Sequence, residues 1–258
     1  MTKRDALRHN IRKVSLMSDR LDLNRARTGV EIDAGLQAYM RRIFVYMGVG
    51  VGITGALAYL FGSWGVANPV AFISMMSGPL RWALLLSPFA IILVMNFGLN
   101  RLSVTALQTS FWAFCAIFGI SMSSIAFVAL QDPLYMTAVA NAFFAASATF
   151  LGAALYGYTT NRDLTAMGGL LFMALFGLII AMIANWFFQS PALSYGISIL
   201  GVLIFTALTA YDTQRLKMSY YQVQGTELAE KIAITGALSL YLNFINLFLF
   251  LLQLFGRR

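Results

Sequence analysis

The chain has 258 residues, of which 59% are apolar and 11% are charged. Soluble domains carry about 25% charged residues, so a water-facing surface around a core of this size is excluded. The formal charge of +8 gathers near the N-terminus instead of covering a surface, which argues against a nucleic-acid partner. The single cysteine, Cys115, has no partner within the chain for a disulfide.

The sequence divides into a basic N-terminal tail, residues 1–42, and an apolar region, residues 43–258. We expect an interfacial helix to begin within residues 35–42 and to continue into the first span, and the part before it to be flexible. The basic side chains either attract anionic lipid headgroups or serve only as a topology signal. They are Lys3, Arg4, Arg8, Arg12, Lys13, Arg20, Arg25, Arg27, Arg41 and Arg42.

The apolar region contains blocks of about 20 apolar residues, the length that a helix needs to cross a bilayer. These blocks are continuous, whereas strands of a membrane barrel would alternate apolar and polar residues. The sequence therefore predicts an all-α integral membrane protein with seven transmembrane helices. We expect them at 43–61, 82–100, 102–128, 136–156, 164–188, 193–211 and 232–255, and the third is long enough to tilt or kink.

The placement of lysine and arginine predicts the orientation, because cytoplasmic segments are enriched in both residues. With the N-terminus inside, fifteen of the 18 basic residues fall on inner segments and three on outer segments. We therefore expect a cytoplasmic N-terminus. The C-terminus is outside if the seventh segment crosses fully, and inside if that segment is re-entrant.

Enzymatic chemistry finds little support in the residue types. The only histidine, His9, lies in the tail, so the spans hold neither a Ser–His pair nor a His/Cys metal site. The predicted spans contain no lysine for a Schiff base, and Asp212 is the only acid at a plausible depth for a pair of catalytic carboxylates. We expect no enzyme activity and no bound cofactor.

Polar residues do follow one face of the last two spans. Ser239, Asn243, Asn246 and Gln253 have spacings that place them on one side of the seventh helix. Near the end of the sixth span, Thr209 and Asp212 also share a face. Polar groups facing lipid would lack hydrogen-bond partners, so both faces should point into the protein. Asp212, at or just beyond the hydrocarbon edge, is either a functional acid or an interfacial acid paired with Arg215.

Four segments resemble the Bax inhibitor-1 family in a bacterial version. The more specific pair is residues 210–214 (AYDTQ) with residues 238–248 (LSLYLNFINLF). The weaker pair is residues 156–164 (YGYTTNRDL) with residues 119–123 (GISMS). The resemblance extends from about residue 32 to the C-terminus.

The resemblance implies a seven-helix fold whose last helix is surrounded by the other six, and a pH-sensitive calcium leak. In the family, two aspartates on the last two helices share a proton and close the pore. Asp212 matches the first, but Asn243 stands where the family motif has the second. The family's arginine that takes the first aspartate in the open pore falls on Arg101.

Replacing the second aspartate by Asn243 changes the expected switch. An amide cannot ionise, but it can donate a hydrogen bond to the Asp212 carboxylate and so favour its charged form. Calcium prefers several oxygen ligands with net negative charge, so Asp212 should form at most a weak calcium site. We therefore expect either a leak with weak or shifted pH dependence, or a relative that has lost the leak. Thr209, Ser239 and Asn246 would form the supporting polar face.

Two other functions remain open. Relatives in this family are known as modulators of a membrane-bound ATP-dependent protease and as suppressors of cell death, so the chain can be a non-conducting regulator that uses its basic tail. A secondary transporter is less favoured, because the repeated halves and broken helices of such folds are not evident. For each function we expect the bacterial inner membrane as the location, with the lipid bilayer, calcium ions and protons as the partners of a leak.

Overall fold

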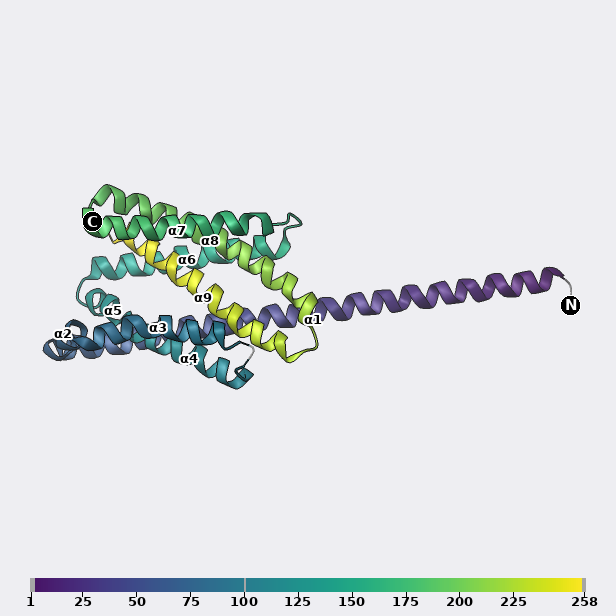
Figure 1. The fold of residues 1–258 in the computed structure, drawn as a ribbon, viewed down its shortest axis with the longest axis horizontal. Coiled ribbons are helices and arrows are strands. Elements are labelled where there is room, and N and C mark those ends of the chain that lie inside the picture. The colour runs from purple at the N-terminus through teal and green to yellow at the C-terminus, as the bar shows by residue number, and fades with distance from the viewer. Residues whose placement is uncertain (1–2, 100, 257–258) are drawn as a thin grey trace. The chain divides into compact units, whose positions relative to one another are not determined.

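The structure, a computed structural model, describes the backbone of residues 3–99 and 101–256 and the side chains of residues 34–84, 86–99 and 101–256 (Figure 1). The described residues form nine helices, and none of them lies in a β-strand. The chain divides into two compact units, Met1–Arg41 and Arg42–Arg258.

The first helix, α1 (Lys3–Ala67), begins much earlier than the sequence analysis predicted. The helix therefore starts well before residues 35–42, where it was expected to begin, while the flexibility of the earlier part stays a prediction. The reason lies in the residue types: this stretch is rich in arginine, leucine and alanine, which favour helices, and the first proline of the chain is Pro69. Helix-forming residues without a breaker continue the helix from the apolar span into the polar segment.

Seven helical segments are long and apolar enough to cross a membrane, which confirms the predicted fold class. The protein is an integral membrane protein. The segments are Ala34–Ala67 of α1, α3 (Pro79–Phe97), Val104–Ala129 formed by α4 (Val104–Ser121) and α5 (Ser123–Ala129), α6 (Pro133–Thr159), α7 (Thr165–Phe188), α8 (Pro191–Val223) and α9 (Glu227–Phe255). The third predicted span is interrupted at Met122, between α4 and α5, as its length suggested.

The helix ends follow simple chemistry. Four of the five prolines stand in the first turn of a helix, where the missing N–H is not needed: Pro69, Pro79, Pro133 and Pro191. The first of these begins α2 (Pro69–Ser77), a short helix that the sequence analysis did not predict. Ser103, Asp132 and Ser190 each accept a backbone hydrogen bond at the start of their helices.

The last helix is the most buried of the seven segments. In α9, 56% of the most apolar window is buried, against 12–39% in the other six. It packs against α8, α6 and α4. This burial agrees with a central position, while encirclement by all six other helices stays a prediction. Because α9 is continuous over 29 residues, about 43 Å at 1.5 Å per residue, it is long enough to cross fully and is not re-entrant.

Tyr241 lies fully buried in the middle of α9 and joins it to the helices around it. Its hydroxyl and the hydroxyl of Thr54 in α1 are 2.7 Å apart. Three rings of α4 meet the Tyr241 ring edge-on: Phe111, Phe114 and Phe118. Aromatic contacts of this geometry are favourable beyond the area that they bury, so Tyr241 helps to fix α9 in the bundle.

Candidate functional site

Asp212 lies within α8, not at its end. The sixth predicted span stops at residue 211, but α8 continues to Val223 and is followed by Gly225, whose positive φ of 78° begins the turn into α9. The residues after Asp212 are polar and basic, so hydropathy falls while the helix goes on. Asp212 is only 6% exposed and so is buried among the helices, while its position at the hydrocarbon edge stays a prediction.

The Asp212 carboxylate accepts two side-chain hydrogen bonds and forms one ion pair. On Oδ2 it accepts from Ser239 Oγ at 2.7 Å and from Asn243 Nδ2 at 2.8 Å. On Oδ1 it faces Arg215 Nη2 at 3.1 Å. Ser239 and Asn243 are four residues apart on α9 and therefore point the same way. The structure thus brings together Asp212, Asn243 and Ser239, as the polar faces predicted.

Arg215 supplies the counter-charge of the site. It lies one turn after Asp212 on α8, and its side chain is 47% exposed whereas that of Asp212 is 8% exposed. Its guanidinium also lies 5.8 Å from the centre of the Tyr211 ring. The predicted pairing of Asp212 with Arg215 is confirmed. The buried carboxylate is therefore neutralised from the more exposed side and hydrogen-bonded from the inner side.

A cavity of about 290 Å³ between α3, α8 and α9 is lined by two of the residues that contact Asp212. Its lining includes Arg215, Ser239 and, from α3, Asn96. A polar cavity of this volume has room for several water molecules. The Asp212 site is therefore bordered by a space that the Arg215 side chain lines.

In the part of the chain that the structure describes, no hydrogen bond or ion pair joins the other predicted residues to Asp212. The side chains of Thr209 and Asn246 donate to the carbonyls of Phe205 and Leu242, one turn earlier in their own helices. Arg101 is exposed in the turn between α3 and α4, and none of its described contacts reaches Asp212. In the structure Arg215, not Arg101, is the cation beside the acid.

The chain can now be compared with known proteins. Residues 36–258 match the family described as Inhibitor of apoptosis-promoting Bax1. The chain belongs to the Bax inhibitor-1 family. It is 37% identical to the inner membrane protein YbhL of Escherichia coli over 89% of this chain and 95% of YbhL. It is also 37% identical to an uncharacterized protein of Caulobacter vibrioides, over 94% of each chain, and 38% identical to one of Borreliella burgdorferi, over 85% of this chain and 92% of the relative.

Two of the Bax inhibitor-1 motifs contact each other beside the site. A Cβ at Gly157, in α6, would collide with the backbone of Ala210 in α8, so the two helices touch there without side chains between them. Lys217 Nζ donates to the carbonyl of Tyr158 at 2.8 Å. The segment of residues 156–164 is thus held against the helix that carries Asp212.

Gln214 completes this contact and was not singled out from the sequence. Its Nε2 donates to the carbonyl of Arg162 and its Oε1 accepts from the N–H of Leu164, both at 2.8 Å. Between them, Asp163 Oδ1 accepts from the N–H of Thr165 at the start of α7. Hydrogen bonds from the side chain and the backbone of Thr165 lower the pKa of the exposed Asp163 carboxyl. The occurrence of Gln214 within the AYDTQ motif was the signal that could have revealed its role.

The polar face of α9 is not continuous in this conformation of the Bax inhibitor-1 fold. Beyond Asn246, the buried positions are apolar: Leu247, Phe250, Leu251 and Leu252. The ring of Phe250 stacks on Phe205 of α8 at 5.8 Å between centroids. The next polar residue of the predicted face, Gln253, bonds with Ser194 and Ser198 near the start of α8.

The geometry offers calcium few ligands. Among the described residues there is no group of three or more His, Cys, Asp or Glu side chains that could hold a metal ion. The Asp212 carboxylate already accepts from two hydroxyl or amide donors and faces a guanidinium. Cation binding at Asp212 requires Arg215 to leave, and the weak calcium site stays a prediction.

Proposed function

We propose that the protein is a calcium-permeable leak whose response to pH is shallow. The observation that carries the proposal is the buried Asp212 carboxylate bonded to Asn243, an amide that cannot take up a proton. A buried acid in a membrane helix marks a pathway for cations or protons more often than it serves packing. Membership of the Bax inhibitor-1 family supports the same choice.

The conformation described here corresponds to a closed leak in this proposal. Arg215 is paired with the Asp212 carboxylate, which would otherwise attract a cation. The stacked rings of Phe205 and Phe250 separate the Asp212 site from the polar group at Gln253. Opening would move Arg215 into the cavity beside Ser239 and part the two rings. Each movement changes a small number of contacts, as expected for a switch between two nearby states.

The charge distribution and a relative support the proposed location. The excess of lysine and arginine on one side supports a cytoplasmic N-terminus. YbhL is named as an inner membrane protein, which supports the bacterial inner membrane for this chain. In that orientation Asp212, late in a helix that runs inwards, is nearer the cytoplasm.

Calcium flux into liposomes that contain the purified protein tests the proposal. Asp212→Asn keeps an oxygen that accepts from Ser239 and Asn243 but removes the charge, so the flux should fall at least about tenfold. Asp132→Asn is the matched control, because this exposed acid caps α6 and asparagine is an equally good cap. Flux that is equal in native protein, Asp212→Asn and empty liposomes would refute conduction.

The alternative function, a regulator that does not conduct, is favoured by a different observation. Ten basic residues lie in the first 42 positions. Their charge is suited to binding an acidic partner, such as a membrane-bound protease, or the membrane surface. If the tail binds the regulated partner, deleting residues 1–30 should abolish regulation and leave calcium flux unchanged. Loss of flux after this deletion, with Asp212 intact, would tie the tail to conduction instead.

A further inference from the structure

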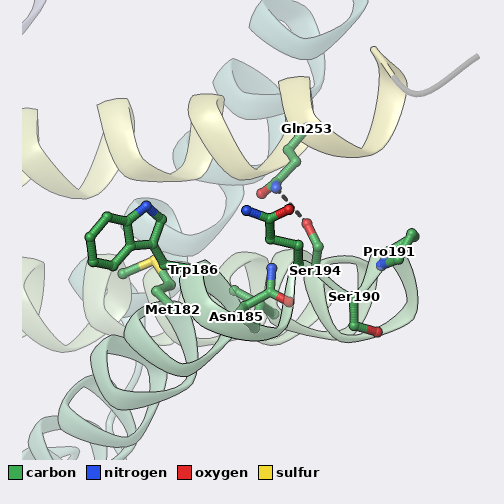
Figure 2. A pocket seen from close by; sticks show the side chains of 9 residues that line it. Met182, Asn185, Trp186, Ser190, Pro191, Ser194 and Gln253 are labelled. Atoms are coloured by element: carbon green, nitrogen blue, oxygen red, sulfur yellow. Dashed lines mark hydrogen bonds between the residues drawn. The ribbon is translucent and has the colours of Figure 1, made fainter.

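A second polar cavity, of about 460 Å³, lies where α7 ends and α8 begins (Figure 2). Its walls are the last turns of α7, the first turns of α8 and Gln253 of α9. Along α8, Pro191 is about 30 Å from Asp212 at 1.5 Å per residue. This distance equals the hydrocarbon thickness of a bilayer, about 30 Å. The cavity therefore lies about one bilayer thickness from Asp212 along α8, where two membrane-spanning segments meet at their ends and lipid headgroups are expected.

One acceptor in this cavity has no donor. Asn185 Oδ1 is buried and accepts no hydrogen bond from the part of the chain that the structure describes. The nearby amide of Gln253 is engaged: its Nε2 donates to Ser194 (Figure 2). Its Oε1 accepts from Ser198. Leaving a buried acceptor unpaired is costly, so a group from outside the chain is expected to supply the hydrogen.

The rest of the lining indicates the charge of that group. None of the nine lining residues is charged, and Trp186, 75% exposed, adds an indole to the wall. Aromatic faces attract cations. The C-terminal end of α7 and the N-terminal end of α8 both border the cavity, so their opposite partial charges offset each other. The cavity thus combines an unpaired acceptor with an aromatic ring.

Few ligand classes satisfy both features. A phosphate or carboxylate has no hydrogen to donate to Asn185 Oδ1. A quaternary ammonium has the charge but no N–H, and a divalent metal needs several oxygen ligands with net negative charge. A primary ammonium group has both the charge and three donors.

We propose that this cavity binds a primary ammonium group. The group is supplied either by the headgroup of phosphatidylethanolamine or by a soluble amine such as ethanolamine. The inference does not depend on calcium conduction, because it rests on a different cavity with its own residues.

Thermal unfolding of the full chain in detergent, after removal of bound lipid, tests the proposal. Phosphatidylethanolamine should raise the unfolding midpoint by about 5 °C or more above phosphatidylcholine with the same acyl chains, as a ligand in large excess over its Kd does. Ethanolamine and choline form the second arm. A shift with ethanolamine assigns the site to soluble amines as well, and a shift with the lipid alone assigns it to the headgroup; both support an ammonium site.

Substitution of Asn185 decides whether the shift arises in this cavity. Asn185→Leu should abolish the shift without lowering the midpoint of the lipid-free protein, because the lost oxygen had no partner. Asn141→Leu, an equal change at an exposed position of α6, should retain the shift. Asn185→Asp, which adds a negative charge, should increase it. Equal shifts with both lipids and no shift with ethanolamine, or an undiminished shift in Asn185→Leu, would overturn the proposal.

Discussion

Asn243 donates an amide hydrogen to Asp212 Oδ2 at 2.8 Å, across the contact between α9 and α8. The two residues are 6% exposed each, so the bond forms away from bulk water. An amide in this place cannot take up a proton, whereas a second carboxylate could share one with Asp212. We therefore expect this pair to decide how strongly the proposed leak responds to pH.

Asn243→Asp should turn the shallow pH response into a steep one. Repulsion between two buried carboxylates favours the uptake of one proton, and the shared proton would then link α8 to α9 and close the leak as the pH falls. Calcium flux into liposomes between pH 5 and 8 measures the change. We expect at least a tenfold difference in flux across this range in the variant and a change of about twofold in the native protein.

Asn246→Asp is the control for this experiment. It adds a carboxylate to α9 three residues further on, at a side chain that bonds Leu242 and not Asp212. Its pH profile should stay close to that of the native protein. A steep and reversible proton block in the native protein would contradict the role given to Asn243.

Arg215→Gln should increase calcium flux at neutral pH. The substitution removes the counter-charge of Asp212 while retaining a polar side chain beside the cavity. A half-exposed ion pair contributes about 1 kcal/mol, which corresponds to about a fivefold change in the ratio of open to closed protein.

Arg101→Gln distinguishes the two candidate arginines. Arg101 is exposed in a turn, and none of its described contacts reaches Asp212, so its removal should leave the closed state intact. If Arg101 receives Asp212 in the open state, as the family resemblance implies, this variant should lower the flux. An increase with Arg101→Gln equal to that with Arg215→Gln would show that the Arg215 contact does not hold the leak closed.

Hydropathy predicted the seven membrane segments because each apolar block must be long enough to cross lipid. It could not predict where a helix continues into polar sequence. For this reason α8 and α1 extend well beyond their predicted ends, at Val223 and at Lys3. These extensions depend on helix propensity and on the absence of proline, and a hydropathy profile reports neither property.

The sequence predicted which helix face carries each residue of the site, but not which residue each side chain bonds. Spacing placed Ser239 and Asn243 on one face, and the structure confirms that both bond to Asp212. Spacing gave Asn246 the same direction, yet its side chain bonds its own helix, because a long amide can reach the carbonyl one turn back. Contacts between distant segments, such as Gln214 with Leu164, depend on packing that periodicity does not encode.

Gly157→Ala should destabilise the protein, because the new methyl group would collide with the backbone of Ala210. Backbone atoms cannot turn aside as a side chain can, so α6 and α8 must separate, at a cost of about 1–3 kcal/mol. Gly152→Ala on the same helix has no heavy atom within 4 Å of the new methyl and should stabilise by about 0.5–1 kcal/mol. Unfolding of both variants in the same detergent measures the difference, and equal midpoints would show that the contact of α6 with α8 is not tight.

Gln214→Leu should loosen the segment of residues 160–164 without unfolding the bundle. The substitution removes the bonds to the carbonyl of Arg162 and the N–H of Leu164, which water can replace only in part. The two bonds together contribute about 1–3 kcal/mol, so the Leu164 amide should exchange its hydrogen at least about fivefold faster. Gln131→Leu removes a glutamine that bonds only the Phe127 carbonyl of its own turn and should leave exchange at Leu164 unchanged. Hydrogen exchange followed by mass spectrometry measures both. Unchanged protection of Leu164 in Gln214→Leu would mean that Gly157 and Lys217 suffice to hold the two family motifs together.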